Sequence, residues 1–383
     1  MDLSKLYEFC TVRQIEYIEA IEKHGSERKA AAALGISHQV INRSMKALRI
    51  KADGRDVLPE NSILPGQKLR GVSNFYGPDG ELKGRWVMSK ADERAQQEAF
   101  EQFIAELCED VKGKAPQIDP PTYSTPDLLA CYPIGDHHHG MYSDADETGA
   151  DYDCKIAKNT LESAFDYLIS IVPPAETALL INLGDYYHAN DSTNETPGHG
   201  NRLDVDTRYG KVMQSGAMAL VNCIIKLLAK HQRVIVWMMP GNHDPDAAFS
   251  LAMALKFYFH NEPRVYVDLG SGLYKYHRFG KNLIGSHHGH GAKAQDLPLI
   301  MAADRREDWG ATLHRVWHCG HIHHKTAKEF PGCVVETHRT LAASDAWHAG
   351  KGYRSKRDLN AIVYHAEHGE IQRSRFDIGM LQE

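Results

Sequence analysis

The sequence predicts a layered α/β domain preceded by a small all-α domain, and three observations support this fold class. Five short apolar runs are rich in β-branched or large residues, as buried strands are. Between most of them lie stretches with apolar residues at three- and four-residue spacing, the pattern of amphipathic helices. A separate helical pattern occupies residues 1–52. Alternating strands and helices indicate layers of helix packed on sheet.

The expected strands end in short clusters of residues that can bind metals. The strands are Leu128–Ile134, Ala178–Leu183, Val234–Met239, Leu283–Gly285 and Val316–Trp317. The expected helices between them are Lys155–Ile171, Tyr209–His231 and Asp246–His260. Ligand sites in open α/β sheets form outside the carboxyl ends of the strands, so we expect the clusters to meet there.

The clusters supply carboxylate, amide and imidazole donors. In chain order they are Asp136-His137-His138, Gly184-Asp185, Gly241-Asn242-His243-Asp244, His287-His288-Gly289-His290 and Gly320-His321-Ile322-His323. Alternate residues of a strand-end loop can point toward one ion, and the glycine before Asp185 permits the sharp turn of a bridging carboxylate. Paired divalent ions about 3.5–4 Å apart can hold both the attacking and the leaving oxygen of an in-line displacement. The clusters therefore predict two-metal phosphoester chemistry.

This ordered pattern, D-x-H, G-D, G-N-H-[DE], a histidine and G-H-x-H, resembles that of the calcineurin-like metallophosphoesterase superfamily. The matching elements run from Asp136 to His323, about half of the chain. The resemblance implies a four-layered α/β/β/α sandwich with a dinuclear site. It also implies two divalent ions, with Mn²⁺ as the expected metal. Oxygen and imidazole ligands suit iron and zinc as well.

The resemblance also implies a role for each matching residue. The first ion would be bound by Asp136, His138, Asp185 and His323. The second ion would be bound by Asp185, Asn242, His321 and a histidine of the fourth cluster, for which the family's usual form favours His288 over His287. His243 would be the catalytic histidine near the leaving group, and Asp244 would orient its ring.

The amino-terminal pattern predicts a helix-turn-helix. An alanine-rich helix over Glu27–Leu34 is followed by the turn Gly35-Ile36, and Ser37 is placed to cap a third helix. Val40 and Ile41 are expected to face inward in that helix. Residues expected to reach bases or phosphates are Ser37, His38, Gln39, Asn42, Arg43 and Lys46. The alternative is an α-helical bundle used for protein contacts.

We expect four segments along the chain. They are the helix-turn-helix at 1–52, a spacer module at 53–112, a linker at 113–126 and the catalytic domain at 127–383. The spacer is expected to hold a β-hairpin around Gly77-Pro78-Asp79-Gly80 and a charged helix over Asp92–Val111. Four prolines in Lys112–Pro126 indicate the linker.

Two loops bear on the substrate. Tyr186–Arg208 is a long polar loop after Asp185, in which His188, Asn190 and Arg208 are candidate substrate contacts. In Ser344–Arg357, aromatic residues alternate with cations, so Tyr353 and Arg354 are candidates as well. Ordinary solvated loops are the alternative in both cases.

Composition limits the remaining possibilities. The net charge is −6, so any nucleic-acid-binding surface must be local. Seven cysteines without a CxxC spacing favour a reducing cytosol, bacterial or that of a phage-infected host. No apolar stretch approaches the roughly 18 residues that a membrane span needs, so we expect no membrane association. A homodimer would fit a helix-turn-helix protein.

Three functions remain open. The first is a DNA nuclease or phosphodiesterase targeted by the helix-turn-helix, similar to the Mre11/SbcD-like nuclease branch or to phage metallophosphatases. Only about sixty residues follow His323, so the long capping region of that nuclease branch is missing. The second is a small-molecule phosphatase or cyclic-nucleotide phosphodiesterase. The third is a non-enzymatic DNA-binding regulator, which the intact set of ligands disfavours.

Overall fold

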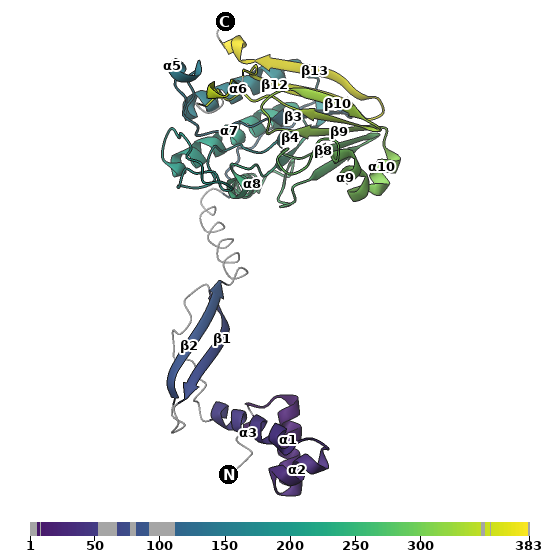
Figure 1. The fold of residues 1–383 in the computed structure, drawn as a ribbon. Coiled ribbons are helices and arrows are strands. Elements are labelled where there is room, and N and C mark those ends of the chain that lie inside the picture. The colour runs from purple at the N-terminus through teal and green to yellow at the C-terminus, as the bar shows by residue number, and fades with distance from the viewer. Residues whose placement is uncertain are drawn as a thin grey trace. The chain divides into compact units, whose positions relative to one another are not determined.

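The computed structural model describes residues 6–7, 9–52, 67–76, 82–91, 112–345, 349–352 and 354–381. The chain divides into two compact units, residues 1–104 and 105–383 (Figure 1). The predicted helix Asp92–Val111 and the predicted turn Gly77–Gly80 lie outside the described residues.

Three helices of the first unit share one small core. They are α1 (Val12–His24), α2 (Glu27–Ala33) and α3 (His38–Ala52). Ser26 caps α2 by accepting a hydrogen bond from the backbone N–H of Lys29. In α3, Ile41 and Met45 are fully buried. Val40 was expected inward but is 48% exposed, because it lies about 100° around the helix from Ile41.

The first unit also contains a two-stranded antiparallel hairpin. Its strands are β1 (Gln67–Tyr76) and β2 (Leu82–Ala91). Both strands lie where the spacer was expected to form a hairpin.

The second unit contains two sheets. The six-stranded sheet has the order β13-β12-β3-β4-β5-β6 and the five-stranded sheet the order β10-β11-β9-β8-β7. The strands of the first are β3 (Thr125–Ile134), β4 (Ala175–Asn182), β5 (Arg233–Met238), β6 (Val265–Asp268), β12 (Asp358–His365) and β13 (Gly369–Asp377). Those of the second are β7 (Lys275–Phe279), β8 (Asn282–Ser286), β9 (His314–Cys319), β10 (Thr326–Phe330) and β11 (Cys333–Thr337). Strands β3 to β6 are parallel, and helices alternate with them along the chain as predicted.

Alternate residues of β3 separate two packed faces. Ala130 and Tyr132 pack with apolar residues of the helices α6 (Cys154–Ile171), α7 (Tyr209–Lys230) and α8 (Pro245–Tyr258). Leu129 and Cys131 pack between the two sheets. On the second sheet, Trp317 packs with residues of α9 (Leu297–Asp304) and of α10 (Arg306–Ala311). The short elements α5 (Ala145–Thr148) and η2 (Ile378–Leu381) complete the described unit. The predicted mixed α/β fold is confirmed.

Buried polar residues tie the two sheets together. His318 of β9 lies 2.9 Å from both Nε2 of His338 and the hydroxyl of Tyr364 on β12. Glu336 of β11 accepts two hydrogen bonds from the guanidinium of Arg373 on β13, which also donates to Glu370. Burial raises the pKa of Glu336, but His338 and Arg373 outweigh it and lower that pKa to about 2. Glu336 is therefore a buried carboxylate whose charge is compensated.

Two expectations about the second unit need correction. The predicted linker packs on the catalytic unit: Ile118 contacts the main core, and its carbonyl accepts from Arg264. The prolines suggested a linker, but tertiary contacts hold the segment, and β3 already begins at Thr125.

Helix α7 has 22 residues and is long and apolar enough to span a membrane by length and composition. Its apolar residues Leu220 and Ile224 are fully buried in the core of this unit.

Candidate metal centre

The predicted metal ligands lie in the tight loops that follow the strands. Among the described non-glycine residues, those with positive φ are Asp136, His138, Asp185, Asn194, His321 and His323. All but Asn194 are predicted ligands. The left-handed conformation costs roughly 1–2 kcal/mol for a residue with a Cβ atom. Strain of this kind clusters where function requires a fixed geometry.

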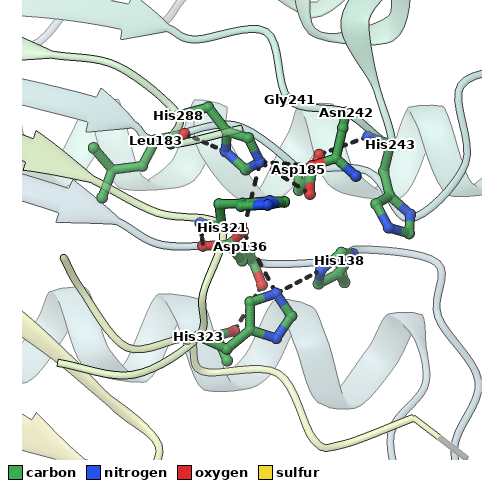
Figure 2. Close-up of polar contacts among 12 residues, drawn as sticks. Asp136, His138, Leu183, Asp185, Gly241, Asn242, His243, His288, His321 and His323 are labelled. Atoms are coloured by element: carbon green, nitrogen blue, oxygen red, sulfur yellow. Dashed lines mark hydrogen bonds and ion pairs between the residues drawn. The ribbon is translucent and has the colours of Figure 1, made fainter. Parts of the chain in front are cut away.

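One group of donors comes from the loops after β3 and β9. Asp136 and His138 are buried, and His323 is half-buried. The Nε2 atoms of His138 and His323 lie 3.2 Å apart, and Nε2 of His323 lies 3.5 Å from Oδ1 of Asp136 (Figure 2). Ligand atoms about 2.0–2.2 Å from a shared ion are about this far apart. These three residues could hold one ion.

A second group of donors surrounds Asp185. Nε2 of His288 lies 3.2 Å from Oδ2 of Asp185 and 3.0 Å from Oδ1 of Asn242. His321 offers a ring nitrogen to the same group. Figure 2 shows Asp136 between His321 and His323, with Asp185 beside His288. Nε2 of His288 also lies 4.0 Å from Oδ1 of Asp136, so the two groups adjoin each other.

The structure distinguishes between the two candidate histidines of the fourth cluster. His288 points into the site, and the carbonyl of Leu183 lies 2.8 Å from its Nδ1, which leaves Nε2 for the donor group. His287 instead stacks on Tyr274 with ring centroids 4.8 Å apart. Its Nδ1 accepts from the backbone N–H of Gly289. The geometry favours His288, as the family pattern did.

Two glycines permit the close approach of the loops. A Cβ atom on Gly241 would collide with the carboxylate of Asp185, and one on Gly320 would reach within 2.5 Å of Oδ2 of Asp136. The absence of a side chain at each position lets a carboxylate enter the centre. The donors, their spacing and these glycines together fit a pair of divalent cations.

His243 is held by a backbone group and not by its neighbour Asp244. Its ring Nδ1 lies 3.0 Å from the carbonyl of His188, and its backbone N–H donates to Oδ1 of Asp185. Asp244 accepts instead from the backbone N–H groups of Asp185 and Tyr187. It also accepts from the N–H of Gly241. The expected role of Asp244 in orienting the imidazole therefore needs correction: this carboxylate joins the two loops that carry Asp185 and Asn242.

Charges in the centre are strongly coupled. Burial alone would lower the pKa of His288, but Asp185 and Asp136 outweigh it and raise that pKa to about 10. Burial would raise the pKa of Asp185, yet His288 holds it well below its usual range. Burial, and then the charge of Asp185, raises the pKa of Asp244 to about 7. A cation bound beside Asp185 would displace the proton of His288.

The candidate substrate residues have different environments. His188 is buried, with its Nδ1 3.2 Å from Nδ1 of His138, so it touches a predicted ligand. Asn190 caps α8 by accepting from the backbone N–H groups of Asp246 and Ala247, which is a structural role. Arg208 precedes α7 and is exposed. Arg354 donates to the carbonyl of Ala349, and Tyr353 lies outside the described residues.

Two supporting contacts were missed by the sequence analysis. The hydroxyl of Thr340 donates to the carbonyl of Asp136, and the carbonyl of Leu183 fixes the ring of His288. Such partners orient metal ligands and set their tautomers. A lone threonine or a backbone carbonyl carries no motif, so only the fold could have located them.

The candidate DNA-contacting residues lie at the start of α3 and along it. Ser37, Gln39, Arg43 and Lys46 are exposed, and His38 is half-exposed. Asn42 is also exposed but donates to Glu27 of α2 at 3.0 Å. Glu27 also pairs with Arg49 at 2.8 Å, so part of the local positive charge is neutralised.

Comparison with known proteins places the chain in a family. Residues 133–364 match the calcineurin-like phosphoesterase family, and the chain belongs to that family. No curated protein matched it. Because the family hydrolyses phosphoric esters with divalent metals, the protein is a metal-dependent phosphoester hydrolase.

Solved structures with similar folds are distant in sequence. A dimetal phosphatase from Danio rerio is 10% identical, with a TM-score of 0.34, and the match covers 66% of this chain and 100% of that one. An archaeal phosphodiesterase is 14% identical, with a TM-score of 0.32 and coverage of 65% and 99%. A Vps29 complexed with zinc from Entamoeba histolytica is 12% identical, with a TM-score of 0.28 and coverage of 65% and 99%.

Proposed function

We propose that the protein is a DNA-directed phosphodiesterase with a dinuclear metal centre. The observation that carries this proposal is the convergence of two adjoining donor groups, one that contains Asp136 and one that contains Asp185. Asp136, His138 and His323 would hold one ion with Asp185, and Asn242, His288 and His321 the other. Its layers fit a four-layered α/β/β/α sandwich, with α6 to α8 outside one sheet and α9 and α10 outside the other.

When bound, two divalent cations would supply an activated water and neutralise negative charge on the phosphoryl oxygens. The residues of the chain provide position and proton transfer. His243 is anchored by its Nδ1–H to the carbonyl of His188, so the doubly protonated ring would give its Nε2 proton to a leaving oxygen. The ring of His243 lies 4.9 Å, between centroids, from that of His138, at the edge of the centre. Mn²⁺ is the proposed metal, with iron and zinc as alternatives.

Direction to DNA rests on the three amino-terminal helices. Arg43 and Lys46 are exposed on α3, where a recognition helix would present them to a phosphate backbone. The alternative function is a small-molecule phosphatase or cyclic-nucleotide phosphodiesterase, for which these helices would serve another role. We propose a cytosolic location because the six described cysteines are all free thiols.

A substrate panel with Mn²⁺ tests the chemistry. It should include phosphomonoesters, cyclic nucleotides, bis-p-nitrophenyl phosphate and linear and single-stranded DNA. We expect hydrolysis of the simple diester and of DNA, and we expect Asp185→Ala and His243→Ala to abolish both while the fold is retained. Hydrolysis of monoesters or cyclic nucleotides without DNA cleavage would favour the alternative. Full activity in Asp185→Ala would contradict the metal centre.

Duplex binding tests the direction to DNA. The double change Arg43→Ala and Lys46→Ala should lower duplex affinity and reduce the slope of log affinity against log salt by about 2, since each phosphate contact contributes roughly 0.9. Lys155→Ala changes an exposed cation on α6 and serves as the control. An unchanged slope in the double variant would refute a DNA-binding role for α3.

A further inference from the structure

The hairpin β1–β2 exposes two large aromatic side chains. Phe75 is 57% exposed and Trp86 is 62% exposed. A two-stranded hairpin is only marginally stable by itself. These two exposed rings are not buried in a core, so they do not stabilise it in that way. Exposed apolar groups gathered on one element mark an interaction site.

The strand register places both rings on the same face of the hairpin. Phe75 pairs with Gly84, and Trp86 pairs with Ser73. Cross-strand partners share a face, and so do residues two apart in one strand. A Cβ atom on Gly84 would lie 3.8 Å from the indole of Trp86. Each ring therefore has a small residue opposite it, and the indole of Trp86 lies over Gly84.

The charge of the two strands indicates the chemistry of that ligand. Within Gln67–Tyr76 and Leu82–Ala91 every charged residue is basic, namely Lys68, Arg70, Lys83, Arg85 and Lys90. The chain as a whole has a net charge of −6. A second copy of the hairpin would carry the same basic charge, which disfavours self-association of two hairpins.

Exposed aromatic rings on a hairpin of basic composition suit an unpaired nucleic-acid strand. Bases stack on the rings, and the cations offset the phosphate charge. A base in a duplex has both faces covered by its neighbours, so a stacking surface selects unpaired bases.

We propose that the face formed by Ser73, Phe75, Gly84 and Trp86 binds single-stranded nucleic acid. The inference deepens the proposed function and rests on it for the substrate, which would be DNA in an unpaired form. The hairpin would hold the unpaired strand, and the exposed surface of α3 would contact duplex.

Fluorescence anisotropy of the full-length protein tests this site. The probe is a labelled oligothymidylate of about 20 nucleotides, measured in about 50 mM and 200 mM salt. We expect Trp86→Ala and Phe75→Ala each to weaken binding about tenfold. Trp86→Phe should retain most of the affinity because phenylalanine also stacks. Tyr123→Ala is the matched control, since Tyr123 is 67% exposed on the other unit.

Tryptophan fluorescence gives a second measurement. Oligothymidylate should quench part of the emission of the wild type, and Trp86→Phe should lose that part while it still binds. Wild-type affinity in the Trp86→Ala, Phe75→Ala double variant would overturn the proposal. A dimer that dissociates in this variant with unchanged oligonucleotide affinity would overturn it as well and assign the face to self-association.

The outcome is separable from that of the proposed function. If the wild type cleaves DNA and the double variant binds oligothymidylate equally well, the hairpin site fails and the phosphodiesterase stands. If oligothymidylate binds through Trp86 but no DNA is cleaved with Mn²⁺, the hairpin site stands and the proposed DNA hydrolysis fails.

Discussion

Replacing Asp244 tests whether this carboxylate holds the metal-binding loops together or acts on His243. Asp244 is fully buried and accepts from three backbone N–H groups, at 3.0 Å from Asp185, 3.2 Å from Gly241 and 2.9 Å from Tyr187. In Asp244→Asn, the amide oxygen can keep the Asp185 and Gly241 bonds, but the NH₂ group would face the N–H of Tyr187. One buried donor without an acceptor costs about 1–3 kcal/mol.

Asp244→Ala would leave all three N–H groups without an acceptor. The cost should reach about 3–9 kcal/mol, a large part of a total stability that is typically about 5–15 kcal/mol. Urea denaturation followed by circular dichroism measures both losses. Asp246→Asn is the control, because this substitution makes the same chemical change two residues away, at an exposed side chain.

Metal affinity should fall together with stability in Asp244→Asn, because the loop that carries Asp185 would lose the bond from the Tyr187 N–H to residue 244. Isothermal titration with Mn²⁺ measures this affinity. If Asp244→Asn kept wild-type stability and Mn²⁺ affinity but lost turnover of bis-p-nitrophenyl phosphate, the reasoning would be refuted. Asp244 would then act through the catalytic histidine, as the sequence pattern suggested.

Three further predictions concern buried polar groups. His188→Ala should weaken Mn²⁺ binding about 10–100-fold by calorimetry, because His138 loses a partner on its ring; unchanged affinity would contradict this role. The pKa of Glu336 falls from 4.5 to about 2 on folding, so this group contributes about 3 kcal/mol above pH 4.5 that is lost as the pH falls toward 2. Glu336→Gln should therefore destabilise the protein at pH 7 but much less at pH 3 in urea denaturation, and an equal loss at both values would exclude the ion pair with Arg373. Burial lowers the pKa of His231 from 6.5 to about 4, so the unfolded chain binds this proton first and stability falls by about 3 kcal/mol as the pH drops from 6.5 to 4. His231→Gln should flatten that part of the pH profile of stability, and an unchanged profile would assign the dependence to other groups.

Much of the centre was predictable because its donors follow strands. A strand that ends in Asp-x-His or Gly-Asp fixes both the residue type and its position at the edge of the sheet. The predicted division of the ligands into two groups agrees with the arrangement of Asp136, His138 and His323 on one side and His288 and His321 on the other.

The parts that sequence reasoning missed depend on backbone contacts. The roles of Asp244 and of the His188 carbonyl follow from where two loops meet, and no residue pattern encodes that meeting. The segment before β3 was predicted to be a linker because it is rich in proline. Its contacts are made with residues far along the chain, such as Arg264, and sequence patterns do not show such contacts. Val40 was predicted to be buried but is exposed, whereas its neighbour Ile41 is buried. Periodicity alone does not tell which of two adjacent apolar residues faces the core.

The positive φ angles explain why these loops need such dense support. Asp136, with φ of 35°, has its carbonyl held by Thr340 and its carboxylate held by the backbone N–H of His321. Asp185, with φ of 51°, has its N–H held by Asp244. Five strained residues at roughly 1–2 kcal/mol each would unwind a loop that lacked such partners. Because like charges and ring nitrogens converge here, bound cations would offset both the strain and the repulsion, and so stability should be coupled to metal binding at this centre.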